Sequence, residues 1–200
     1  MNLNITKETV KTLIDQKGEA RGIAFQTDEK FILFKKGAEK LGEIESQIGL
    51  LIDEDFKYDK IDASGFYPVG LRAVSILVIA ESLDLDDSGI KDMGFLAPKT
   101  SMAIRLFTRY FLSIEKVFEK VAMIWSRHYT SGTLEPLEIN HSENYLKLKL
   151  KDFNVHPVFC TYLSGYFKKI GEMATKDKVT IEEIECFFKE GKDHIFEIRW

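Results

Sequence analysis

Cysteine, histidine and proline are scarce in this chain of 200 residues, which contains two cysteines, four histidines and four prolines. Two cysteines exclude a disulfide framework, and a metal site built from cysteine and histidine would use most of this small stock. The chain has no stretch rich in serine, glycine and proline, and therefore no obvious interdomain linker. We predict one domain, or one domain with a small extra lobe.

Long charged segments and long apolar segments are missing as well. No basic tract runs for five or six residues, and the net charge is −4, which excludes the usual pattern of a nucleic-acid-binding protein. The longest apolar run, residues 73–80, is far shorter than the roughly 20 residues that cross a bilayer. The N-terminus has no apolar signal core. These absences predict a cytoplasmic protein without a membrane span.

The signatures of common catalytic sites are also lacking. The chain has no Gly-x-Ser-x-Gly motif, no glycine-rich phosphate loop and no His-Glu-x-x-His motif. The acidic run of Glu182, Glu183 and Glu185 is more typical of a solvated strand edge than of an acid–base pair. An enzyme is therefore not the favoured interpretation.

Aromatic side chains are plentiful, with 15 phenylalanines, seven tyrosines and two tryptophans, which is enough to line a pocket. The first two-thirds of the chain has mainly helical spacing. Helices are predicted over residues 7–17, 27–48, 68–80 and 98–128, and a short strand or extended segment over residues 22–26. A further helix start is predicted at Asp86-Asp87-Ser88, within residues 83–94. The third of these helices is apolar nearly all round and should be buried.

After Gly132 the spacing changes to alternation. Residues 133–140 and 144–150 predict a hairpin with one wet face, and residues 179–188 and 194–200 predict a second hairpin. A helix between them, over residues 155–175, would cover one face of the sheet. The predicted fold is α+β: an N-terminal helical lobe (1–130) packed on a C-terminal four-stranded antiparallel sheet (131–200) of order β-β-α-β-β, as one compact unit.

Both cysteines fall where one metal ion could collect them. In the second hairpin, Cys186 and His194 are predicted to lie opposite each other, with β-carbons about 4.5–5.5 Å apart. On the preceding helix, His156 and Cys160 are spaced i, i+4. Two thiolates, one imidazole and one more ligand form a tetrahedral zinc set, with His156 or a carboxylate from residues 180–186 as the fourth ligand. The alternative is that both cysteines are ordinary core residues.

Four features of the last third of the chain occur in a fixed order: Cys160-x4-Gly165, Glu183-x-x-Cys186, a ligand residue at His194, and the strand Phe196-x-Ile198-x-Trp200. Together they resemble the 4-vinyl reductase domain, over about residues 133–200. That domain occurs in bacteriochlorophyll-pathway proteins and in the sensor modules of phenol-responsive transcription activators. It is related to trafficking transport-particle subunits and to haem nitric-oxide sensors.

The resemblance implies a structural zinc ion. In the phenol sensors three cysteines and one glutamate hold it, which assigns the role to Cys160, Glu183 and Cys186, with His194 in place of a cysteine. Glu183 lies three residues from Cys186, so a regular strand would point these side chains to opposite faces. Either a bulge brings Glu183 to the metal, or His156 takes its place.

The resemblance also implies a pocket between the helical lobe and the sheet for a hydrophobic or aromatic small molecule. We place in it the aromatic side chains on elements that must meet, with plain core packing as the alternative: Phe107, Phe111, Trp125, Tyr129, Phe159, Tyr162 and Tyr166. The predicted function is a small-molecule sensor or carrier. The alternatives are a reductase or other tetrapyrrole-pathway enzyme, a haem-based gas sensor, and a dimeric interaction protein.

Haem is not expected from the sequence. The haem-phosphate clamp of the nitric-oxide sensors reads Tyr-x-Ser-x-Arg, and residues 129–133 here have Thr133 in the place of the arginine. Elsewhere, Arg72 stands in an apolar helix and needs a partner, either a ligand carboxylate or an internal acid such as Asp62 or Glu81. Arg105 and Arg109, one turn apart, form either an anion site or a solvated face.

Overall fold

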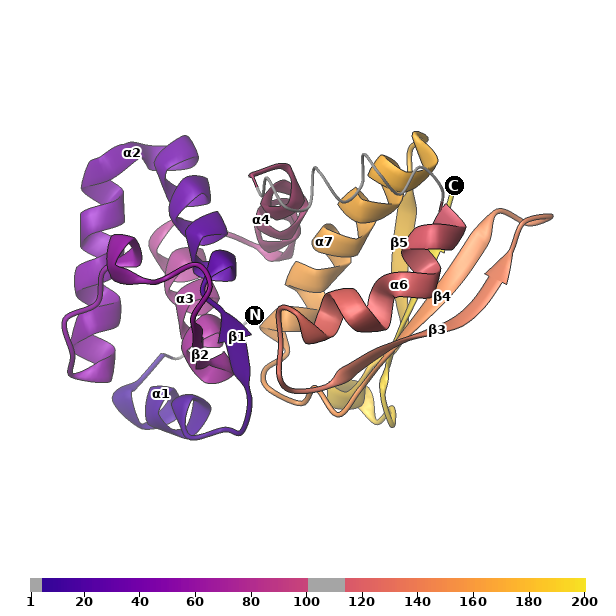
Figure 1. The fold of residues 1–200 in the computed structure, drawn as a ribbon. Helices are drawn as coiled ribbons and strands as arrows, with labels where there is room; N and C mark the ends of the chain where they lie inside the picture. The colour runs from indigo at the N-terminus through magenta and orange to yellow at the C-terminus, as the bar shows by residue number, and fades with distance from the viewer. Residues whose placement is uncertain (1–4, 101–113) are drawn as a thin grey trace.

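A helical lobe and an antiparallel sheet lie side by side in the computed structural model, which describes residues 5–100 and 114–200 and confirms the α+β class (Figure 1). Within these ranges the helices are α1 (Lys7–Ile14), α2 (Ile23–Ile52), α3 (Val69–Ser82), α4 (Asp87–Thr100), α6 (Ile114–Ser126) and α7 (Val158–Thr175). The strands are β1 (Glu19–Arg21), β2 (Phe66–Pro68), β3 (Thr133–Asn140), β4 (Tyr145–Lys151), β5 (Thr180–Glu185) and β6 (His194–Arg199). Single 3-10 turns form η1 (Tyr58–Lys60) and η2 (Phe187–Lys189).

The first helix, α1, begins at Lys7 as predicted, directly after its capping residue Thr6. The Thr6 hydroxyl accepts a hydrogen bond from the Thr9 amide, and the Thr9 hydroxyl accepts one from the Thr6 amide. This reciprocal pair satisfies two amides that a helix start otherwise leaves free. At the other end α1 stops at Ile14, short of the predicted end at residue 17.

The strand predicted over residues 22–26 is wrong, because Ile23 begins helix α2. Strand β1 ends just before, at Arg21, and the Gly22 amide donates to the Gly65 carbonyl. Apolar runs of this length do not distinguish a strand from a buried helix. The consequence matters for the site, since the first turns of α2 face the sheet lobe.

Helix α3 runs through the middle of the helical lobe and is buried along almost its whole length, as predicted from its apolar sequence. It packs between α1 and α2 and contacts α7. Nowhere in the described part of the chain is a helix both long and apolar enough to span a membrane.

The helix start predicted at Asp86-Asp87-Ser88 is confirmed, whereas the separate helix start predicted at Pro98 is wrong. Pro98 lies inside α4, which begins at Asp87, and the Asp86 carboxylate accepts a hydrogen bond from the Gly89 amide at 2.9 Å. An Asp in the capping position starts a helix more strongly than a later proline does. Residues 101–113, with Arg105 and Arg109, lie outside the described residues.

The C-terminal sheet has the strand order β3-β4-β6-β5, all antiparallel. In β4, Leu146, Leu148 and Leu150 are buried, while Lys147 and Lys149 alternate with them and form ion pairs with Glu138 and Asp193 at 2.9 Å. Helices α6 and α7 cover the apolar face (Figure 1). The predicted hairpin with one wet face is confirmed.

The second hairpin turns differently from the prediction. Strand β5 ends at Glu185, which pairs with Ile195, and the chain then forms η2; on its other side β6 pairs His194 with Leu150 of β4. The Cys186 carbonyl accepts hydrogen bonds from the amides of Lys189 and Gly191, which lengthens the turn. The spacing predicts a three-residue loop formed by Lys189, Glu190 and Gly191. The structure has a longer connection instead, which includes the 3-10 turn η2.

Candidate metal site and interlobe cavity

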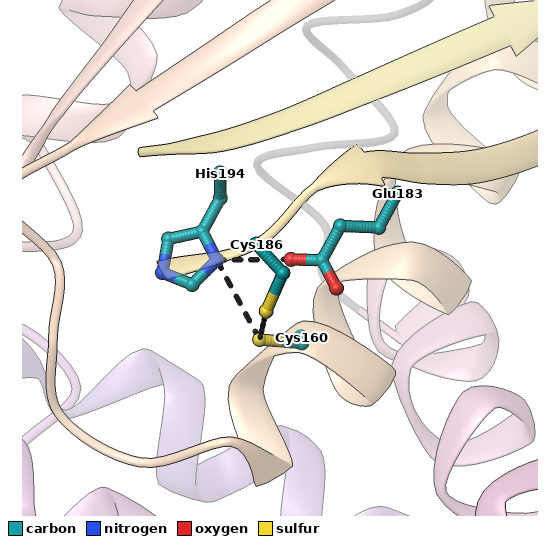
Figure 2. A group of neighbouring side chains, drawn as sticks. All are labelled: Cys160, Glu183, Cys186 and His194. Atoms are coloured by element: carbon teal, nitrogen blue, oxygen red, sulfur yellow. Dashed lines mark hydrogen bonds and ion pairs between the residues drawn. The ribbon is translucent and has the colours of Figure 1, made fainter. Parts of the chain in front are cut away.

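Four side chains that are distant in sequence meet where the second hairpin touches α7 (Figure 2). Cys160 comes from the first turn of α7, Glu183 from β5, Cys186 from the residue after β5, and His194 from the start of β6. One ligand atom from each lies within 4.8 Å of all the others. The structure thus brings together the four residues of the predicted metal set.

Two of their separations match those of a tetrahedral metal site. The Sγ atoms of Cys160 and Cys186 are 3.6 Å apart, and Cys160 Sγ is 3.6 Å from His194 Nδ1. Ligands bound to zinc at about 2.0–2.3 Å in a tetrahedron are about 3.3–3.8 Å from one another. His194 Nδ1 and Glu183 Oε1 are slightly closer, at 2.9 Å, which is hydrogen-bond distance.

A register shift brings Glu183 to this group. Glu183 pairs with Phe196 and Glu185 pairs with Ile195, so β5 has one extra residue between them. This is the bulge that the Glu183–Cys186 spacing required. The carboxylate of Glu185 is engaged elsewhere, since it accepts hydrogen bonds from the amides of the turn at 2.9 and 3.2 Å.

His156, the alternative ligand, lies outside the group. Its Nδ1 accepts a hydrogen bond from the Val158 amide at 3.1 Å and so caps the start of α7. Burial raises the pKa of the Cys160 thiol, and the charges of Glu183 and Cys186 raise it further. A divalent cation would reverse this balance, because it stabilises thiolates.

A second candidate site is a cavity of about 250 Å³ between the helical lobe and the sheet. Of the predicted pocket residues, Trp125, Tyr129, Tyr162 and Tyr166 line it. Phe159 is not among its lining residues and packs against Phe153 instead, with ring centroids 5.0 Å apart. Phe107 and Phe111 lie outside the described residues.

Sequence reasoning missed much of the apolar wall. Helix α2 contributes Ile23, Ala24 and Thr27, and the sheet contributes residues including Leu146 and Leu148. The alternation of β4 already marked its leucines as inward-facing. Ile23 and Ala24 were not identified because the sequence predicts a strand over residues 22–26.

One part of the cavity wall is basic. Arg21, Arg127 and His128 line it, and the Arg21 amide donates to the His128 carbonyl at 2.8 Å. Burial lowers the pKa of His128, and the charges of Arg21 and Arg127 lower it further. The imidazole is therefore neutral near pH 7, which is the form that binds metals.

A buried ion pair lies in the helical lobe, between α3 and α2. Arg72 bonds to Asp28 Oδ2, and both side chains are shielded from solvent. The predicted partners are wrong: Asp62 bonds to Ser64 at 2.9 Å, and Glu81 accepts from Gln47 at 3.0 Å. The actual partner, Asp28, is 44 residues from Arg72 in the sequence, so local spacing could not identify it.

Comparison with known proteins rests on structure, because no family model and no curated protein sequence matches the chain. A mutant H-NOX protein from S. oneidensis in the Fe(II) ligation state has a TM-score of 0.69 at 10% identity, covering 90% of this chain and 95% of that one. The unliganded Fe(II) H-NOX protein from K. algicida has a TM-score of 0.61 at 15% identity, covering 90% and 95%. A structure described as modulating haem redox potential through porphyrin distortion has a TM-score of 0.62 at 12% identity, covering 90% and 97%.

At these identities the similarity shows the fold, and the chain has the fold of these H-NOX proteins. The predicted superfamily includes the haem nitric-oxide sensors, so that part of the prediction agrees with the neighbours. The closer resemblance to the 4-vinyl reductase domain stays a prediction.

The prediction of zinc, with haem not expected, is wrong about haem, because the proteins that share this fold are haem proteins. The expectation that haem is absent depended on residues 129–133 alone. The cavity, in contrast, is lined by residues from both lobes, which those five residues do not describe. The lining residues include the kinds of side chain that ligate haem iron, namely the imidazole of His128 and the phenols of Tyr129, Tyr162 and Tyr166. Arg21 and Arg127 offer positive charge for propionates.

Proposed function

We propose that this chain is a sensor module that binds a small molecule in the interlobe cavity. The observation that carries this proposal is the cavity itself, of about 250 Å³, with walls from α2, α6, α7 and the sheet. This volume is slightly below the range of about 300–1,000 Å³ typical of ligand pockets. Because its walls belong to both predicted lobes, residues 1–130 and 131–200, an occupant would contact both.

Haem is the first occupant to test. The solved neighbours are haem proteins, and this favours the gas-sensor alternative over an unspecified hydrophobic ligand. When bound, haem would supply an iron that takes a diatomic gas. His128 would ligate the iron, Arg21 and Arg127 would pair with one propionate, and the apolar wall would exclude water.

Reconstitution with hemin tests this assignment. We expect an intense Soret absorption band and one haem per chain, because the cavity offers a neutral imidazole. His128→Ala should weaken haem binding or change the band position. His141→Ala is the matched control, since His141 is exposed in the β3–β4 turn, and it should behave as the wild type.

Two results would contradict the assignment. An unchanged spectrum in His128→Ala would remove that residue as the iron ligand. A wild-type protein that takes up no haem but still binds apolar small molecules would leave the cavity as the site and exclude haem as its occupant.

The four-residue group at the second hairpin supports a second, independent proposal: a structural metal site. Its four protein ligands leave no open position, and catalytic zinc sites keep one open. Thiolate and imidazole donors suit zinc among the common divalent ions. An ion held by Cys160, Glu183, Cys186 and His194 would tie β5 and β6 to the start of α7.

A further inference from the structure

The buried Arg72–Asp28 pair has unsatisfied hydrogen-bonding capacity. Arg72 bonds to Asp28 through Nη1, and its Nε and Nη2 have no hydrogen-bond partner within 3.5 Å among the residues that the structure describes. Asp28 Oδ1 is likewise unpartnered, while Oδ2 also accepts from Ser75 at 2.8 Å. The phenols of Tyr129 and Tyr162 lie close to the guanidinium: burial raises the pKa of each phenol, and Arg72 acts in the opposite direction. Buried guanidinium groups normally have their donors satisfied, so two free donors at full burial need a physical reason.

This pair lies directly behind the cavity. The Tyr162 ring, which lines the cavity, has its centroid 4.9 Å from Arg72 Cζ. Thr27, the neighbour of Asp28 on α2, lines the cavity too, as does Tyr129. Arg72 itself is not among the lining residues, so a ligand group in the cavity reaches its donors past the rings of Tyr129 and Tyr162.

We propose that the polar end of the cavity receives a carboxylate, held by Arg72 with the hydroxyls of Tyr129 and Tyr162, while the apolar remainder of the ligand fills the cavity. Two guanidinium donors on one side match the two oxygens of a carboxylate. The inference rests on the proposed function, since it names the ligand class for the same cavity. The carboxylate could belong to a short-chain or aromatic acid or to a haem propionate, and the recognition chemistry is the same.

The charges balance if Asp28 takes a proton when the ligand binds. Burial raises the pKa of Asp28 to about 6, against the lowering effects of Arg72 and Ser75. A proton on Oδ1 turns that orphaned acceptor into a donor. The other groups around the pair, Tyr58, Tyr129 and Tyr162, stay neutral phenols, so the ligand carboxylate replaces Asp28 as the counter-charge of Arg72.

Matched pairs of acids and esters test the proposal on the wild-type protein. Octanoate is compared with methyl octanoate, and hemin with its dimethyl ester, by calorimetric titration and thermal shift. We expect at least one acid to bind about tenfold or more tightly than its ester. A preference confined to the octanoate pair identifies a free acid as the ligand, and one confined to the hemin pair identifies a propionate.

Variants then locate the preference. Tyr129→Phe and Tyr162→Phe should each reduce the acid-to-ester ratio several-fold, and the double variant Asp28→Asn with Arg72→Gln should abolish it. The double variant removes both charges together, so neither is left buried and unpaired. Tyr166→Phe is the control: its phenol shares the cavity, but Arg72 does not influence its pKa, so the ratio should stay at the wild-type value.

The outcomes separate this inference from the proposed function. Equal binding of acids and esters by the wild type overturns the carboxylate site and leaves the cavity as a ligand site. Binding of neither kind of probe overturns both. An acid preference that survives the folded double variant places the anion elsewhere and also overturns the inference.

Discussion

Arg72→Met is expected to destabilise the protein by about 3–5 kcal/mol at pH 7, because it leaves the Asp28 carboxylate buried without a counter-charge. Arg72 is fully shielded from solvent, and it is the cation that bonds to Asp28. Urea unfolding followed by circular dichroism would measure the loss. A loss below about 1 kcal/mol would mean that the pair is not buried together as described.

The effect should depend on pH with a definite sign. The pKa of Asp28 is raised above its unfolded value of 3.8, to about 6, so its contribution to stability is fully present below pH 3.8 and is lost as the pH rises through about 6. Without Arg72 the carboxyl holds its proton more tightly, and the variant should lose less stability at pH 5 than at pH 7.

A double variant provides the control. Asp28→Asn combined with Arg72→Met removes the buried carboxylate as well, so it should be more stable than Arg72→Met alone at pH 7. It should also lack the pH dependence between pH 4 and 6. A double variant no more stable than the single one would show that packing, and not charge, causes the loss.

Cys186→Ser is the second change with a large expected effect. It removes one of the two proposed thiolate ligands, so the purified variant should lack the stoichiometric zinc ion that we expect in the wild type. The lost anchoring of β5 and β6 to α7 should cost about 3 kcal/mol or more, which lowers the Tm by about 6–12 °C. Elemental analysis by mass spectrometry and a thermal unfolding scan measure the two effects.

Histidine variants provide a matched comparison at the same site. His194→Ala should lose the metal as Cys186→Ser does, whereas His156→Ala should keep it, because His156 caps α7 outside the group. A chelator should destabilise the wild type and leave Cys186→Ser unaffected. Metal-free wild-type protein of full stability, or loss of metal from His156→Ala, would contradict the proposed site.

Local sequence patterns were sufficient for the alternation of the sheet and for the bulge beside Glu183. The strict alternation of β4 determines which side chains face the helices, and the Glu183–Cys186 spacing required the bulge that β5 contains. Each of these predictions depends on neighbours a few residues apart, where backbone geometry constrains the side chains closely.

Interactions between distant elements could not be predicted in this way. The partner of Arg72 lies 44 residues away, on a helix whose start was taken for a strand. Strand β5 ends at Glu185 because residues 187–189 form a 3-10 turn, which has no sequence signature. The cavity combines residues from both lobes, so its wall was identified only where aromatic side chains marked it.

Occupancy of the interlobe cavity is the central claim, and native mass spectrometry tests it most directly. The wild type and Ala24→Trp, whose larger side chain would fill part of the cavity, are each equilibrated with hemin and with octanoate. The account predicts a bound-ligand mass on the wild type with at least one probe, and none on Ala24→Trp, with both proteins folded. Equal binding to the two proteins, or no binding to the wild type, would contradict the account.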